Sequence, residues 1–178
     1  MDNINGLPLH PLIVHVPVAM LPLAFLGVIV MMVRRAWYER YRWAVLVVGG
    51  IGTLGAILAA ATGESLESDV RRSEGVESMR AIHDHAEAGD VARTVAIVFL
   101  VALAAWVVIP WYLDRRHALG DTDATPHDGR GTTIARNALM VTTAVLAAAS
   151  MVTVYRAGHT GATSVWHEQL ESRSSNGG

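Results

Sequence analysis

Histidine is the residue type in this sequence that is best suited to bind a metal or a cofactor. The 178 residues include eight histidines and no cysteine. The absence of cysteine excludes disulfides, thiolate metal sites and the CxxCH type of haem attachment. Histidine, Asp, Glu, Met, Tyr and the backbone remain as ligands, and neutral imidazole is the most common ligand of transition metals in proteins.

Two of these histidines begin the first long apolar stretch, in the sequence HPLIVHVP at residues 10–17. Pro11 suits the first turn of a helix, where its missing N–H costs nothing, so His10 would lie at the helix entrance and His15 one turn deeper. On an ideal helix the two rings would point about 140° apart, so they are not expected to bind one ion together. The two later prolines of this stretch predict either a packing kink or space for a cofactor.

The other candidate histidines precede and follow the later apolar stretches. His83 and His85 are separated by one residue, which puts them about 200° apart on a helix, and their pattern alone does not decide which of them is functional. His159 follows the last apolar stretch and has glycines on both sides, which allow a ligand to approach the backbone closely. His83 and His85 have the alternative of being solvated side chains.

Two arginines, Arg93 and Arg156, belong to the same segments as these histidines. Arginine forms bidentate pairs with carboxylates, and haem propionates are carboxylates. The alternative is that both arginines pair with nearby acidic side chains or with lipid headgroups.

Four long apolar stretches must position these residues. Just over half of the chain (52%) is hydrophobic and 17% is charged, and the apolar residues form runs at 12–33, 44–62, 95–113 and 137–155. Each run is long enough to cross a membrane, which takes about 20 apolar residues. The sequence therefore predicts an all-α, polytopic membrane four-helix bundle, a single domain over residues 1–171 with a disordered tail at 172–178.

The distribution of charge predicts the orientation of the bundle. All 14 basic residues are arginine, and eight of them lie in the two loops that follow the first and third runs, whereas eleven of the sixteen acidic residues lie on the other side. Short loops rich in arginine stay in the cytoplasm, so both termini and the segment 63–92 are expected to face outward. Tryptophan and tyrosine beside the inner loops predict an aromatic belt. The net charge of −2 excludes the basic surface that nucleic-acid binding needs.

The segments between the runs carry weaker signals. Segment 63–92 contains scattered apolar residues among charges, which favours a short amphipathic helix on the membrane surface, and segment 114–135 is expected to be an irregular linker. Within 44–62, Gly and Ala recur at spacings of three and four residues. This spacing predicts close packing of helices or, as an alternative, a bare face for a flat prosthetic group.

The motif HPLIVHVPVA at residues 10–19, the Thr62-Gly63 pair and the closing GHTGA at residues 158–162 resemble a bacterial family of four-helix integral membrane proteins, catalogued as a domain of unknown function. The resemblance covers about residues 7–166. Some relatives share a chain or a gene neighbourhood with Rieske-type or cytochrome c domains. The resemblance therefore implies a place in respiratory electron transfer, a cytochrome b-like protein with haem b as cofactor, and the bacterial cytoplasmic membrane as location.

Together these observations predict a multi-pass electron-transfer protein that holds haem near its outer face and passes electrons between the quinone pool and an outer redox partner or a larger membrane complex. If every candidate histidine is a ligand, two haems are expected. The alternatives are a non-haem metal site made of the same histidines and a structural subunit that anchors a redox complex without its own cofactor. The expected cofactor-binding residues, with the histidines in order of preference, are His15, His159, His85, His10, Arg93 and Arg156.

Overall fold

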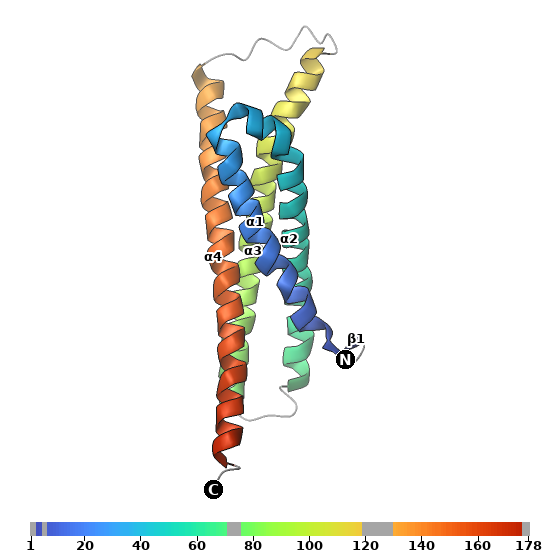
Figure 1. Cartoon of the computed structure of the whole chain (residues 1–178), viewed down its shortest axis with the longest axis vertical. Helices are drawn as coiled ribbons and strands as arrows, with labels where there is room; N and C mark the ends of the chain where they lie inside the picture. The colour runs from blue at the N-terminus through green and yellow to red at the C-terminus, as the bar shows by residue number, and fades with distance from the viewer. Residues whose placement is uncertain (1–2, 5–6, 71–75, 119–129, 176–178) are drawn as a thin grey trace.

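The structure, a computed structural model of the whole chain, describes residues 3–4, 7–70, 76–118 and 130–175, and side chains at 13–63, 85–116, 118 and 131–159. It contains four long helices (Figure 1): α1 (Leu9–Val33), α2 (Arg35–Val70), α3 (Val76–Ala118) and α4 (Arg130–Ser175). Each helix contains one of the expected apolar spans. Two short strands, β1 (Asn3–Ile4) and β2 (Leu7–Pro8), pair in antiparallel fashion just before α1. The predicted all-α bundle is thus confirmed.

The helices alternate in direction around the bundle. Extensive contacts join α1 to α2, α2 to α3, α3 to α4 and α4 back to α1, and the start of α1 lies at the same end as the end of α4 (Figure 1). One end therefore contains the start of α1, the end of α2, the start of α3 and the end of α4, and we call it the histidine end. The opposite end, where α1 turns into α2, is called the arginine end.

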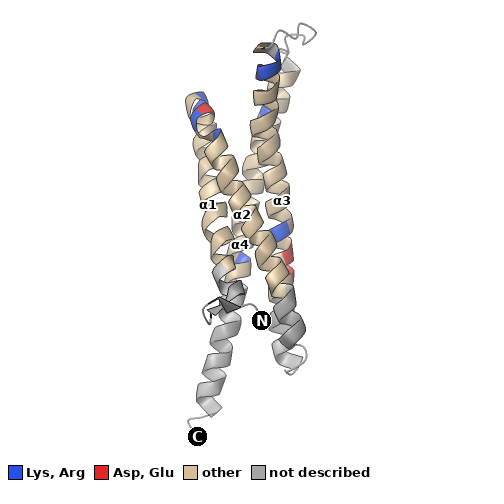
Figure 2. Cartoon of the chain, turned by 90° about the vertical axis from the view of Figure 1, so that its right-hand side faces the viewer, with Lys and Arg blue, Asp and Glu red and all other residues tan. Residues whose placement is uncertain are grey.

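Each helix includes a segment that is long and apolar enough to cross a membrane: Ile13–Val33, Arg35–Gly63, His85–Arg116 and Gly131–His159. Charged residues gather toward the ends of these segments, as Figure 2 shows. Large apolar side chains such as Leu26 and Val101 are exposed on the surface of the bundle, which suits contact with lipid rather than water. The protein is therefore a multi-pass membrane protein.

The helices extend well beyond the apolar runs, and this corrects several expectations for the connecting segments. The expected loop after α1 is a single residue, Arg34, whose carbonyl accepts hydrogen bonds from the backbone N–H groups of Trp37 (3.0 Å) and Tyr38 (3.1 Å). Residues 34–43 contain no glycine or proline. The residues after Arg34 can therefore form the first turns of α2 rather than a loop.

The separate surface helix expected in segment 63–92 is likewise wrong. Residues 63–70 continue α2, and residues 76–92 form the first part of α3. The expected linker 114–135 is helical at both ends, since α3 runs to Ala118 and α4 begins at Arg130; residues 119–129 lie outside the described part. α4 also continues to Ser175, into the segment expected to be a disordered tail, of which 176–178 lie outside the description.

The glycines of α2 allow α1 to pack unusually close to it. A Cβ atom added to Gly55 would lie 2.8 Å from Val16 Cγ1 and 2.9 Å from Pro17 Cδ, and one added to Gly52 would lie 2.9 Å from Leu21 Cδ2. Pro17 is itself buried in this contact. At Gly52 and Gly55, the glycine face of α2 is therefore covered by α1 and not by a prosthetic group. The prediction of close helix packing is confirmed.

Replacing Gly55 by alanine should therefore destabilise the bundle by about 1–3 kcal/mol, because the new methyl group overlaps a β-branched side chain and a proline ring. Gly50 provides the matched control, since a Cβ added there meets nothing within 4 Å. Gly50→Ala should be neutral or stabilise the helix by up to about 1 kcal/mol. Thermal unfolding of the purified protein in detergent measures both effects, and equal unfolding temperatures for the two variants would contradict the close contact.

Candidate functional site

Three of the predicted histidines lie at one end of the bundle. His15 is near the start of α1, His85 is near the start of α3, and His159 is near the end of the membrane-spanning part of α4. Because the helices alternate in direction, all three positions belong to the histidine end (Figure 1). The side chains of His10 and of His83 lie outside the described residues.

Contacts between helices give the relative depths of His15 and His85. Gly55 packs against Val16 and Pro17, so His15 lies roughly level with Ile57, about 6 Å from Thr53 along the helix axis. The Thr53 hydroxyl donates a hydrogen bond of 3.2 Å to the Ala96 carbonyl oxygen. His85 precedes Ala96 by eleven residues, which places it about 16 Å from that level in the same direction.

These depths separate His85 from His15 by about 10 Å along the axis. Two imidazoles that bind the same ion must lie at a similar depth, so His15 and His85 are a poor pair. His159 comes from α4, which packs directly against α1, so His15 and His159 belong to neighbouring helices. Contact between α1 and α4 does not set the depth of His159, so the preference for His159 over His85 rests on the sequence.

The surroundings of the three histidines differ. The side chains of His15 and His159 are exposed, whereas that of His85 is half-buried. The ring of His159 lies 6.2 Å from the ring of Tyr155, one turn earlier on α4, with an angle of 38° between their planes. Within the described ranges, no three His, Asp or Glu side chains come together as a metal site. A compact site with several protein ligands therefore has no support in that part of the chain, whereas a haem needs only two axial ligands.

The two candidate arginines also belong to the histidine end. Arg93 donates from Nη2 to the carboxylate of Asp90, one turn earlier on α3, at 3.1 Å. Pairing with a nearby acidic side chain is one of the alternatives that the sequence allows for Arg93. A partly exposed pair of this kind contributes little stability. Arg156 is exposed and precedes His159 by one turn.

At the arginine end, arginine side chains and aromatic rings form a cluster. From the sequence, these residues predicted only the orientation of the bundle and an aromatic belt, and not contacts between them. Such contacts attract a guanidinium to the face of a ring. The spacing of three or four residues in most of these pairs was the signal available in the sequence. Guanidinium carbons lie 5.4–5.8 Å from ring centroids in the pairs Arg34–Trp37, Arg35–Tyr38, Arg42–Tyr38, Arg42–Trp43, Arg115–Trp111 and Arg116–Tyr112.

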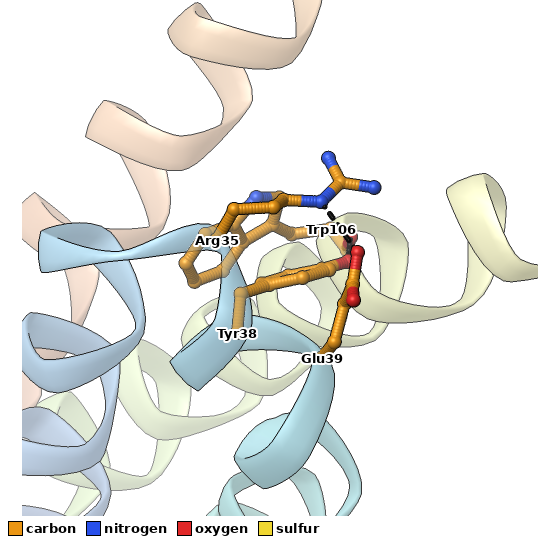
Figure 3. A network of polar contacts seen from close by, with 4 residues as sticks. All are labelled: Arg35, Tyr38, Glu39 and Trp106. Atoms are coloured by element: carbon orange, nitrogen blue, oxygen red, sulfur yellow. Dashed lines mark hydrogen bonds and ion pairs between the residues drawn. The ribbon is translucent and has the colours of Figure 1, made fainter.

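A proline in α3 explains why Tyr38 is buried in this cluster. Pro110 has no N–H, so the carbonyl of Trp106, four residues earlier, loses its partner within the helix. The hydroxyl of Tyr38 donates to that carbonyl oxygen at 2.8 Å, and the two rings lie 5.2 Å apart (Figure 3). Beside them, Arg35 pairs with Glu39 at 2.9 Å. The hydrogen bond from Tyr38 thus fixes the start of α2 to α3.

The family described as "Predicted membrane protein (DUF2231)" matches residues 6–173. This match covers nearly the whole chain and confirms the resemblance to a four-helix membrane family of unknown function. No curated protein and no solved structure matches the chain. The function has therefore to be inferred from the side chains themselves.

Replacing Tyr38 by phenylalanine should destabilise the protein by about 1–3 kcal/mol, because the buried Trp106 carbonyl then has no donor. The control is the same substitution in a Pro110→Ala background, where the restored N–H of residue 110 can bond to that carbonyl. Tyr38→Phe should cost clearly less there. A double-mutant cycle of thermal unfolding measures the difference, and an equal cost in both backgrounds would show that the proline is irrelevant to the contact.

Proposed function

The chain belongs to the DUF2231 family of predicted membrane proteins, and we propose that it is a b-type cytochrome-like electron-transfer protein. The observation that carries this proposal is that three histidine-bearing helix segments, from α1, α3 and α4, lie at the same end of the bundle. Cofactor sites in helix bundles are built from side chains of facing helices. The donor set at this end, imidazoles together with arginines, is of the kind that holds haem b.

We propose His15 and His159 as the axial ligands, with His85 and then His10 as the next choices. The first two come from helices in direct contact, and both side chains are exposed. Haem bound there would supply reversible one-electron chemistry, and two histidine ligands leave no open position for a substrate. A second haem requires His85 and His10 to act together as a further pair.

The surrounding side chains have supporting roles in this proposal. Arg93 and Arg156 bind the two propionates through charge-assisted hydrogen bonds. Tyr155 lies against the ring of His159 and restrains its orientation.

We further propose that the histidine end faces outward and that the protein resides in the bacterial cytoplasmic membrane. Short, arginine-rich connections remain in the cytoplasm. In this orientation electrons pass between the quinone pool and a redox partner, or a larger membrane complex, at the outer side. Seven of the nine arginines with described side chains lie at the other end: Arg34, Arg35, Arg40, Arg42, Arg115, Arg116 and Arg136.

A second candidate function is that of a structural subunit that anchors a redox complex and has no cofactor of its own. Two observations favour it. Arg93 already has an acidic partner, and no cluster of three metal-binding side chains exists among the residues that the structure describes.

An absorption spectrum of the protein purified in detergent, with and without dithionite, distinguishes these functions. We expect a Soret band, and sharp α and β bands after reduction. His15→Ala should abolish or shift these bands, because it removes an axial ligand. His117→Ala, near the end of α3 at the arginine end, is the matched control and should leave them unchanged.

Other outcomes have equally clear meanings. An unchanged spectrum of the His15→Ala variant would reject this residue as a ligand. A colourless protein with stoichiometric metal would support the non-haem site, and a colourless, metal-free protein would support the structural subunit.

A further inference from the structure

Four side chains form a row across the contact between α2 and α3 at the arginine end: Arg42, Trp43, Trp111 and Arg115. The two tryptophan rings meet edge to face, with centroids 5.5 Å apart and an interplanar angle of 87°. The Arg42 guanidinium lies 5.8 Å from the Trp43 ring, and the Arg115 guanidinium lies 5.4 Å from the Trp111 ring. Each helix thus contributes one guanidinium and one indole to what we call the Arg–Trp row.

Among the described residues, no carboxylate neutralises the positive charges of this row. Arg35, nearby on α2, pairs with Glu39, but neither Arg42 nor Arg115 has a carboxylate partner in the part of the chain that the structure describes. Arg42 Nε is moreover buried without a hydrogen-bond partner among those residues. Arg42 is nevertheless partly exposed and Arg115 is exposed, so the terminal N–H groups of these two guanidinium groups can reach an anionic oxygen.

The position of the row indicates which anion it receives. Tryptophan and arginine are typical of the level of the lipid headgroups. From Trp43 the same face of α2 continues with Val47 and Ile51, and from Trp111 a face of α3 continues with Val108; all three side chains are apolar and exposed. The row is therefore continuous with a surface for acyl chains, which a free phosphate ion would not use.

We propose that the Arg–Trp row binds one anionic phospholipid, with its headgroup held by the guanidinium groups of Arg42 and Arg115. Arginine recognises phosphate oxygens through charge-assisted, bidentate hydrogen bonds. Basic sites between membrane helices bind anionic headgroups in this way. The indoles of Trp43 and Trp111 lie beside the glycerol region, and the acyl chains follow the apolar faces of α2 and α3. The site is separate from the histidine end and does not depend on any cofactor there.

Native mass spectrometry of the detergent-purified full chain tests the proposal, with phosphatidylglycerol and phosphatidylcholine of equal chain length as probes. We expect one retained phosphatidylglycerol and no comparable retention of phosphatidylcholine. The double variant Arg42→Gln/Arg115→Gln should retain phosphatidylglycerol at least about tenfold more weakly, because it removes two charged donors. Arg40→Gln/Arg136→Gln is the matched control, with the same change of charge at the same end, and should retain the lipid as the unmodified protein does.

Three results would overturn the proposal. Equal losses in the two double variants would indicate a general attraction of the basic end for anions. Equal retention of the two lipids would show that the charge of the headgroup is not recognised. Inorganic phosphate alone, if it raised the unfolding temperature as much as phosphatidylglycerol, would identify a free anion as the ligand. If the double variant does not fold, Arg115→Gln alone, at an exposed position, should still weaken retention several-fold, and unchanged retention would reject the site.

Discussion

The close contact between α1 and the glycine face of α2 is the constraint on which the remaining structure depends. Gly52 and Gly55 have no side chain on this face, so the Pro17 ring and its neighbours approach the α2 backbone directly. The contact fixes the register of the first two helices, and their connection through a single residue, Arg34, leaves little freedom to change it. The depth of His15 in the bundle follows from this register.

Hydrogen bonds between α2 and α3 also hold the bundle together. In the membrane, backbone groups must find partners within the protein. Tyr38 supplies one to the carbonyl that Pro110 releases, and Thr53 reaches the carbonyl of Ala96. Both contacts join α2 to α3, one near the arginine end and one deeper in the bundle. They keep the two ends of the molecule in a fixed relation.

The length of the apolar runs was sufficient to predict the four helices, and their alternation was sufficient to predict that histidines of α1, α3 and α4 share an end. The ends of the helices could not be predicted from the apolar runs. Each run ends at the first charged residue, whereas the helices continue through residues 64–70 and 76–92. The spacing of glycines predicted close packing but not its partner. The different depths of His15 and His85 depend on contacts such as Thr53–Ala96, which no local pattern contains. The Arg–Trp row likewise requires the register of α2 against α3.

The histidine-bearing segments of α1 and α4 share one end of the bundle, and their separation can be measured directly. Because the sequence has no cysteine, two spin labels can be attached at chosen positions, and their separation can be measured by double electron–electron resonance. Labels on His15→Cys/His159→Cys should lie within about 25 Å of each other, since they occupy neighbouring helices. Labels on His15→Cys/Arg116→Cys should lie more than about 30 Å apart, at opposite ends. Similar distances for the two pairs, or a longer distance for the first, would contradict the account.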